Sequence, residues 1–519
     1  MAGGSVGRTA YGRGALWGDA LLTAIAAVSW ALIGMAGAAA LGLHLLRADS
    51  AGSLGPMTAA VVALGAGGSV TPSGDMSAFG LAGAEAGSAI EIAPLGVGLV
   101  GALLLSWFFL RSLRTAGVVV PLGELLVRAG AVAALFVGML GGLAWAGHDV
   151  ITIDGGALHS PDKLDIPGIG DVGGLLPDRI GDLIDAKAAV GFTVDTGPTL
   201  LGGLLWCVGV LLIALLASRR TPLPLGWGFV HRAVRPAVSA VVSVLLVAVA
   251  AGWAAASYAA ISDDHPARIF GAALLGAPNG VWVGVGVGLF VPFDGRSSGV
   301  LTYVLPDPVD RLLASGEPRS VTLGRLAELD GRVWLLGVAA VLMTLLAGVF
   351  AAIRTPVAGG AGRFVAGCAV RLGVVTGVAL AVLARVTVVS LDAGLSVLGV
   401  DAVGAGLELR GDVLVAGLLG VGWGAAAGAS GAGLAWVSGA AGKGVARMAE
   451  GGGGAGGGSG GGFGGGSGGG AGDGSGDGSG NGSGGGAGDG SGASGPYAPR
   501  PSYRAPHPET NPYLRKPEG

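Results

Sequence analysis

The sequence has little charge and almost no cysteine. Only 12% of its 519 residues are Asp, Glu, Lys or Arg, whereas about 25% is usual in soluble domains. The two cysteines, Cys207 and Cys368, lie in or beside separate apolar segments. Neither a structural disulfide nor a cysteine-based metal site is therefore expected. Together with the 51% of hydrophobic residues, the shortage of charge predicts a membrane protein.

Signatures of catalytic and nucleotide-binding sites are also missing. The sequence contains no HExxH, GxSxG or CxxC motif, and Gly442-Lys443 lacks the Ser/Thr and the first glycine of a phosphate-binding loop. The GxG patterns at residues 284–288 lie in an apolar run instead of a strand-to-helix turn. We therefore expect no enzyme, no cofactor, no resident metal and no nucleic-acid partner.

Long apolar segments are abundant instead. Eight of them hold about 17 or more mainly apolar residues, enough to cross the ~30 Å hydrocarbon core as helices. The first is far longer than the ~7–15 apolar residues of a cleaved signal peptide. The eight predicted spans are residues 20–46, 92–110, 129–147, 199–217, 236–260, 333–352, 372–390 and 413–438. The fold class predicted is an all-α, polytopic transmembrane bundle over residues 20–450, preceded by a cytoplasmic N-terminus at residues 1–19.

A ninth apolar segment, residues 270–293, is interrupted by Pro278-Asn279-Gly280. Beyond the interruption only Val281–Val291 remains apolar, roughly 16 Å of helix. We interpret the segment as a re-entrant or broken helix, which exists at membrane depth only inside protein or beside a water-filled cavity. Pro278, Asn279 and Gly280 are therefore the candidate helix break, and a cavity beside them would favour transport.

The distribution of basic residues supports this count of spans. If the N-terminus is cytoplasmic and segment 270–293 enters and leaves on one side, the cytoplasmic loops contain 14 Lys or Arg and two acids. The opposite loops contain 11 basic and 25 acidic residues over much greater lengths. The positive-inside rule counts basic residues near the spans, so we predict a plasma-membrane protein with both termini cytoplasmic. Nine or ten crossings stay open if residues 57–70 also enter the bilayer.

Glycine recurs every fourth residue in two of the apolar segments, and such stripes let helices approach closely. The candidate helix-packing residues are Gly276, Gly284, Gly288, Gly420, Gly424 and Gly428. Arg385 is the only charge inside a predicted span, which makes it the candidate intramembrane charge. It is either an anchor that extends to the interface or part of a solute path. Asp19, at the inner end of the first span, suits a helix N-terminus.

Residues 451–519 differ in composition from the rest of the chain. Residues 451–495 are almost entirely Gly, Ser and Ala, which cannot bury a core and therefore predict a disordered, flexible linker. A Pro- and Tyr-rich end follows, with the basic pair Arg515-Lys516. We expect this cytoplasmic tail either to bind a cytoplasmic protein partner or to be disordered without one.

Two blocks of sequence are distinctive: APLGVGLVGALLLSWFFLRSLR at residues 93–114 and ALLGAPNGVWVGVGVGLFVPF at residues 273–293. With the basic N-terminus and the Gly-rich tail, they resemble the streptophobe family, very hydrophobic membrane proteins of Streptomyces and related actinobacteria. The resemblance implies an actinobacterial cell membrane and no assigned activity. Three function classes follow: a structural or scaffold-type envelope protein first, a transporter or permease for an apolar or lipid-like solute second, and a membrane enzyme third.

The predicted topology can be tested with reporter fusions placed directly after Ala314. Because segment 270–293 is expected to leave the membrane on the side by which it enters, alkaline phosphatase fused there should be active and a green fluorescent reporter dark. The same reporters after Arg363 should give the opposite result. Cytoplasmic reporter activity after Ala314 would mean that segment 270–293 crosses the membrane.

Overall fold

The computed structural model describes most of the chain up to residue 443. The described residues are 6–50, 52–75, 84–115, 121–146, 148–153, 188–219, 221, 227–297, 319–357, 359–397 and 400–443. They belong to one compact unit within Met1–Gly456. The predicted disordered tail at residues 451–519 lies outside the described residues.

Nine helices in the described part of the chain are long and apolar enough to cross a membrane. Eight of them occupy the predicted spans: α1 (Val6–Leu45), α3 (Leu95–Thr115), α4 (Leu122–Ala146), α6 (Thr196–Ala217), α7 (Arg235–Ile261), α11 (Trp334–Arg354), α12 (Ala361–Val386) and α13 (Val413–Val437). The ninth is α8 (Pro266–Gly288). The predicted helical membrane bundle is therefore confirmed. Helix α12 begins earlier than predicted, and it ends earlier because the chain from Val389 onward pairs as a strand.

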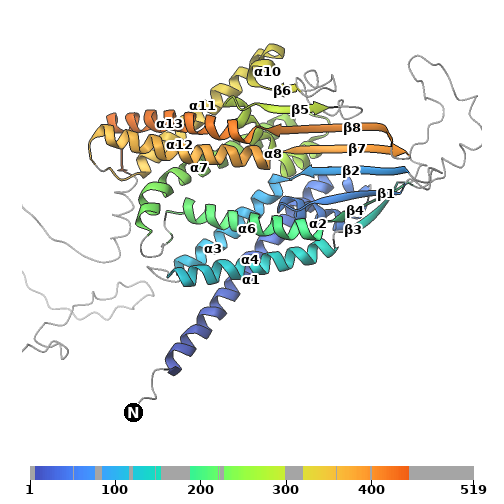
Figure 1. The fold of residues 1–519 in the computed structure, drawn as a ribbon, viewed down its shortest axis with the longest axis horizontal. Helices are drawn as coiled ribbons and strands as arrows, with labels where there is room; N and C mark the ends of the chain where they lie inside the picture. Colours follow the sequence, from blue (N-terminus) through green and yellow to red (C-terminus); the bar gives the residue numbers. More distant parts are fainter. Residues whose placement is uncertain are drawn as a thin grey trace, which may run out of the picture. The chain divides into compact units, whose positions relative to one another are not determined.

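A sheet of eight antiparallel strands extends from one end of the bundle (Figure 1) and was not predicted from the sequence. The strands are β1 (Val70–Asp75), β2 (Ala84–Ile92), β3 (His148–Ile153), β4 (Ala188–Val194), β5 (Phe293–Ser297), β6 (Arg319–Val321), β7 (Val389–Val397) and β8 (Val400–Gly411). Their order is β3-β4-β1-β2-β7-β8-β5-β6. We call this end of the bundle, from which the strands extend, the sheet side. The opposite end, where Arg128, Arg235 and Arg354 lie near the ends of α4, α7 and α11, is the arginine side.

Helix α8 begins and ends on the sheet side. Near its start, Gly271 lies against Gly42 at the sheet-side end of α1, and at its end Gly288 lies against Leu336 in the first turn of α11. Strand β5 then follows in the same sheet as the other strands. Helix α8 therefore lies across the ends of the spans, and eight helices connect the two sides.

The order of elements is repeated along the chain. The first half contains α1, α2 (Leu54–Gly65), β1–β2, α3, α4, β3–β4 and α6, and the second contains α7, α8, β5–β6, α11, α12, β7–β8 and α13, with α10 (Leu323–Leu329) added before α11. Each half supplies four neighbouring strands in the same order, β3-β4-β1-β2 and β7-β8-β5-β6. Each half also starts and ends on the arginine side. The halves are thus two structural repeats in one orientation, joined by the pairing of β2 with β7.

The turn that leads into the first strand of each repeat has the same geometry. In the first repeat Gly68 N donates to Ala63 O at 2.8 Å, and in the second Val291 N donates to Gly286 O at 2.9 Å. In both turns the residue before the donor is left-handed: a glycine at φ 82° in the first repeat and Phe290 at φ 67° in the second. This combination is the Schellman ending of a helix, so α2 and α8 end in equivalent ways.

The last span of each repeat starts with an equivalent contact. Asp195 N donates to Ser69 O at 3.1 Å before α6, and Asp412 N donates to Pro292 O at 3.2 Å before α13. Matching residues continue along these two helices at a constant offset of 217 positions: Asp195 and Asp412, Gly203 and Gly420, Trp206 and Trp423. The repeat is therefore visible in the sequence once the structure shows where to look.

Helix α8 is longer than its equivalent α2. Aligned on their common ending, α2 matches the last 12 residues of α8, and residues 266–276 form an extension of about three turns. This extension contacts the first repeat: a Cβ on Gly42 of α1 would lie 2.7 Å from the Leu275 side chain, and one on Gly96 of α3 would lie 2.8 Å from Leu275 O. Helix α8 therefore holds the two repeats together on the sheet side.

Glycines bring α13 into backbone contact with two neighbouring spans. A Cβ on Gly420, Gly424 or Gly428 would lie 2.7 Å from the nearest atom of α12. A Cβ on Gly431 would lie 2.3 Å from the carbonyl carbon of Gly348 in α11. Real Cβ atoms essentially never approach within 3.0 Å, so only glycine fits at these positions. Helix α13 is therefore packed between α11 and α12 without side-chain spacers, as glycine stripes in membrane helices allow.

A matched pair of alanine substitutions in α13 tests this packing. Gly424→Ala forces a methyl group into the α12 backbone and should destabilise the protein by about 1–3 kcal/mol, the usual effect of overpacking. Gly422→Ala is the control, because no atom lies within 4 Å of a Cβ there, and it should be neutral or slightly stabilising. Thermal unfolding of the purified protein in detergent measures both. Equal midpoints for the two variants would contradict the packing.

Candidate functional site

The predicted helix break is not present in the structure. Helix α8 runs continuously through Pro278, Asn279 and Gly280. A proline inside a helix leaves the carbonyl four residues earlier without its helical partner, and here that carbonyl belongs to Leu274. The first turn of α3 lies against it, because a Cβ on Gly96 would be 2.0 Å from Leu274 O. The predicted interruption was therefore wrong: the helix continues, and the freed carbonyl is covered by the close approach of α3.

Asn279 is bound to the backbone that leads β2 into α3. Its side-chain Nδ2 donates to Ala93 O at 2.8 Å, and its Oδ1 accepts from Leu95 N at 3.0 Å. The first N–H groups of a helix have no partner within the helix, and Asn279 provides one to the first residue of α3. Both ends of the amide are therefore used in fastening α8 to the first repeat, and the cavity-lining role considered from the sequence is not needed to explain this residue.

The glycine stripe of α8 packs closely at one end only. Outside its own stretch of helix, no atom of the described residues lies within 4 Å of a Cβ on Gly276 or Gly280. A Cβ on Gly284 would be 3.4 Å from the Leu336 side chain, and one on Gly288 would be 2.8 Å from Ala340 Cβ. The packing role predicted for Gly276 was therefore wrong. Because α8 lies across the ends of the spans, α11 meets only its last turns.

Arg385 lies at the sheet-side end of α12. It is the residue before Val386, the last residue of the helix, and its side chain is exposed. A long basic side chain at the end of a span reaches the interface easily. The position favours the anchor over the solute path as the role of this residue.

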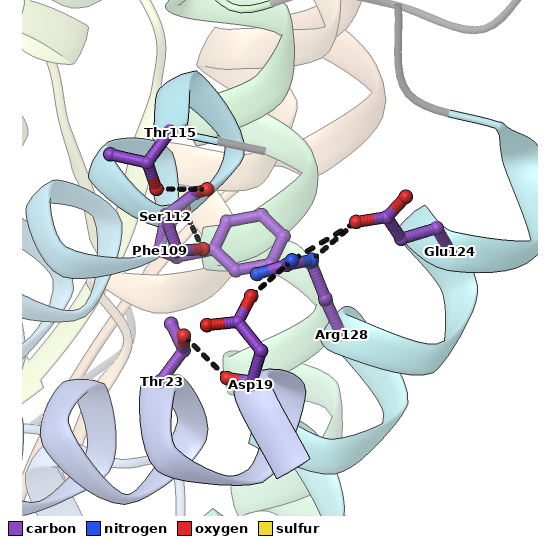
Figure 2. Close-up of polar contacts among 7 residues, drawn as sticks. All are labelled: Asp19, Thr23, Phe109, Ser112, Thr115, Glu124 and Arg128. Carbon is purple, nitrogen blue, oxygen red and sulfur yellow. Dashed lines mark hydrogen bonds and ion pairs between the residues drawn. The ribbon is translucent and has the colours of Figure 1, made fainter. Parts of the chain in front are cut away.

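Buried charge is found on the arginine side of the first repeat instead (Figure 2). Helix α1 begins at Val6, so the prediction that Asp19 lies in the first turn of a helix was wrong. Asp19 Oδ2 is 2.5 Å from Nη2 of Arg128 in α4. Glu124, one turn earlier in α4, accepts from Arg128 Nε at 3.0 Å. Figure 2 shows the guanidinium between the two carboxylates, with Phe109 of α3 beside it.

The ion pairs around Arg128 compensate a charge that would otherwise be unfavourable. The Arg128 side chain is 4% exposed, compared with 17% for Glu124 and 63% for Asp19. A buried cation is stable only when paired, and two carboxylates supply that pairing here. Asp19 and Arg128 are 109 positions apart, so no local sequence pattern indicates the contact. The network fastens α1 to α4, and we interpret it as structural.

Metal and thiol chemistry find no support within the described residues. No group of three or more His, Cys, Asp or Glu side chains in that part of the chain could hold a metal ion. Cys207 and Cys368 are buried free thiols on α6 and α12.

In comparisons with known proteins, no family model, no curated protein and no solved structure matches this chain. The resemblance to the streptophobe family stays a prediction. The fold itself, with its many long apolar helices, is that of a multi-span membrane protein.

The role of Asn279 can be tested by replacing it with leucine. Asn279→Leu leaves Leu95 N and Ala93 O without their partners and should destabilise the protein by about 1–2 kcal/mol, because both hydrogen bonds are half-buried. Gly280→Ala is the control on the same turn, because a Cβ there has no neighbour within 4 Å. The midpoint of thermal unfolding in detergent measures both variants. An unchanged midpoint for Asn279→Leu would refute the fastening role.

Proposed function

We propose that this protein is a non-enzymatic, scaffold-type protein of the plasma membrane. Its bundle holds the eight-stranded sheet outside the cytoplasm, and its Gly-rich tail recruits a cytoplasmic protein partner. The observation that carries the proposal is the sheet itself, in which both repeats contribute strands to one continuous surface. The orientation rests on the positive-inside rule, because the arginine side of the bundle would face the cytoplasm.

The join between the repeats supports a static role. Transporters built from repeats move one repeat or bundle against the other. Here β2 and β7 pair over their whole length, from Ala84 opposite Val397 to Ile92 opposite Val389. Helix α8 adds a second connection through Asn279. Relative movement of the repeats would have to break this ladder, which supports a scaffold over a permease.

The transporter alternative was favoured by a predicted break in the helix beside a cavity. That alternative relied on backbone groups exposed to a cavity at Pro278-Asn279-Gly280. The helix is continuous there, the carbonyl freed by Pro278 lies against Gly96, and the amide of Asn279 is bound at both ends. An apolar solute remains the class that such a permease would carry.

The proposal is tested by removing the tail and by measuring the movement of the repeats. Deletion of residues 451–519 should abolish recovery of the partner after crosslinking in cells, whereas deletion of residues 451–495 alone should keep it because the Pro- and Tyr-rich end remains. Membrane insertion of both variants is checked with the topology reporters. Equal recovery of partner from the full chain and from the chain lacking residues 451–519 would count against recruitment by the tail.

Distances between spin labels distinguish the scaffold from a transporter. Exposed leucines offer one pair on the sheet side, Leu201 with Leu414, and one toward the arginine side, Leu212 with Leu434. In nanodiscs a scaffold should give one narrow distance distribution for each pair. Two populations that change in opposite directions on the two sides are the signature of alternating access, and they would overturn the scaffold role.

A further inference from the structure

The second repeat contains a buried arginine without an ionic partner. Arg235, the first residue of α7, is 2% exposed. Its Nη1 donates to Thr221 O at 2.9 Å, while Nε and Nη2 are buried and have no hydrogen-bond partner. A π-helical turn, Val230–Val234, directly precedes it, and such turns are frequent at functional sites. A guanidinium removed from water with two free donor atoms is strongly unfavourable unless an anion reaches it.

A second arginine lies along the same face of α7. Arg354, the last residue of α11, donates from Nη1 to Ser239 Oγ at 3.1 Å and to Ser243 Oγ at 3.2 Å. Ser239 and Ser243 follow Arg235 by four and eight residues, so all three lie on one face of the helix. Two guanidinium groups from different spans therefore meet this face at the arginine side.

A third arginine comes from the loop after α6. Burial and, to a smaller extent, the neighbouring charge of Arg354 lower the pKa of Arg219. The adjacent Ser218 and Thr221 hydroxyls are 2.6 Å apart, and Thr221 is the residue that binds Arg235. Arg235 is thus linked to the loop after α6 through Thr221, and Arg354 is linked to α7 through Ser239 and Ser243. The three arginines occupy neighbouring positions at the ends of α6, α7 and α11, and we call them the arginine cluster.

Within the part of the chain that the structure describes, no carboxylate forms an ion pair with this cluster. Among the ion pairs of the described residues, none includes Arg219, Arg235 or Arg354. The ends of α6 and α11 provide only about half of a negative charge each, against three full positive charges. The arginine side of the first repeat is different, because Arg128 has two carboxylates there. Among the described residues, the cluster therefore has an excess of about two positive charges.

We propose that Arg219, Arg235 and Arg354 bind a phosphate group. A phosphate supplies the missing charge, and guanidinium forks match its oxygens with paired hydrogen bonds. The cluster lies at the ends of spans, at the depth of lipid headgroups, so the phosphate belongs either to an anionic phospholipid or to a soluble anion. The site is independent of the proposed scaffold role.

Thermal stabilisation of the full chain measures the binding and separates the two sources. One arm compares nanodiscs of phosphatidylcholine with and without phosphatidylglycerol. The other adds inorganic phosphate, against chloride at equal ionic strength, to the protein in phosphatidylcholine. Each arm is repeated on Arg235→Gln, Arg354→Gln and Arg219→Gln. Arg232→Gln is the matched control, because Arg232 lies in the same π-helical turn and is exposed.

Stabilisation of the wild type by phosphatidylglycerol alone would assign the site to a lipid headgroup, and stabilisation by inorganic phosphate would assign it to a soluble anion. In either case the three variants should bind about tenfold or more weakly, the usual effect of losing a charge-assisted hydrogen bond, and Arg232→Gln should bind as the wild type does. If Arg235→Gln does not fold, the two less buried arginines decide the question. No stabilisation by either ligand, or wild-type binding by Arg354→Gln and Arg219→Gln, would overturn the proposal.

Discussion

The pairing of β2 with β7 is the interaction on which the rest of the structure depends. Each repeat alone would present β2 or β7 as an edge strand, whose free N–H and C=O groups would be open to pairing with another chain. Pairing over the full length of both strands joins two four-stranded sheets into one. The spans that carry these strands are thereby brought together, and α8 can lie across the ends of both repeats. The arrangement of the two repeats therefore depends on the pairing of the β2 and β7 edges.

The two repeats share a plan but differ in what they add to it. In the first, the short helix α2 ends against its own repeat, and the buried Arg128 is neutralised by Asp19 and Glu124. In the second, α8 has gained about three turns that reach across to α1 and α3, and Arg235 is left without a carboxylate. The buried guanidinium of Arg128 thus has two carboxylate partners, whereas that of Arg235 has none among the described residues. This difference in charge is the basis of the proposed phosphate site.

Most of the membrane bundle could be predicted from the sequence, and most of the sheet could not. Apolar length alone places the eight spans, because the bilayer requires about 20 apolar residues per helix. The strands lack a comparable signal: β2 and β7, AEAGSAIEI and VSLDAGLSV, contain several Gly, Ala and Ser residues, which have low strand propensity. Each is a strand because it finds a partner in the other repeat, and no local pattern indicates that partner. The repeat is visible in the sequence, because Asp195, Gly203 and Trp206 each have an identical residue 217 positions later. Hydrophobic periodicity does not compare such distant positions.

Hydropathy and the placement of arginine by themselves determined which segments enter the bilayer and that segment 270–293 returns to the side it came from. Both depend on the composition of each segment and on the lipid and water around it, and not on which residues the segment contacts in the fold. Only the tertiary structure decided that Pro278 stays inside a helix, and that Gly276 has no close packing partner among the described residues. It also decided that, within them, Arg128 has carboxylate partners and Arg235 has none. The continuity of α8 at Pro278 depends on the approach of Gly96, and the neutralisation of Arg128 depends on Asp19. Both partners are distant in the sequence, so the environment of a buried group cannot be read from its own segment alone.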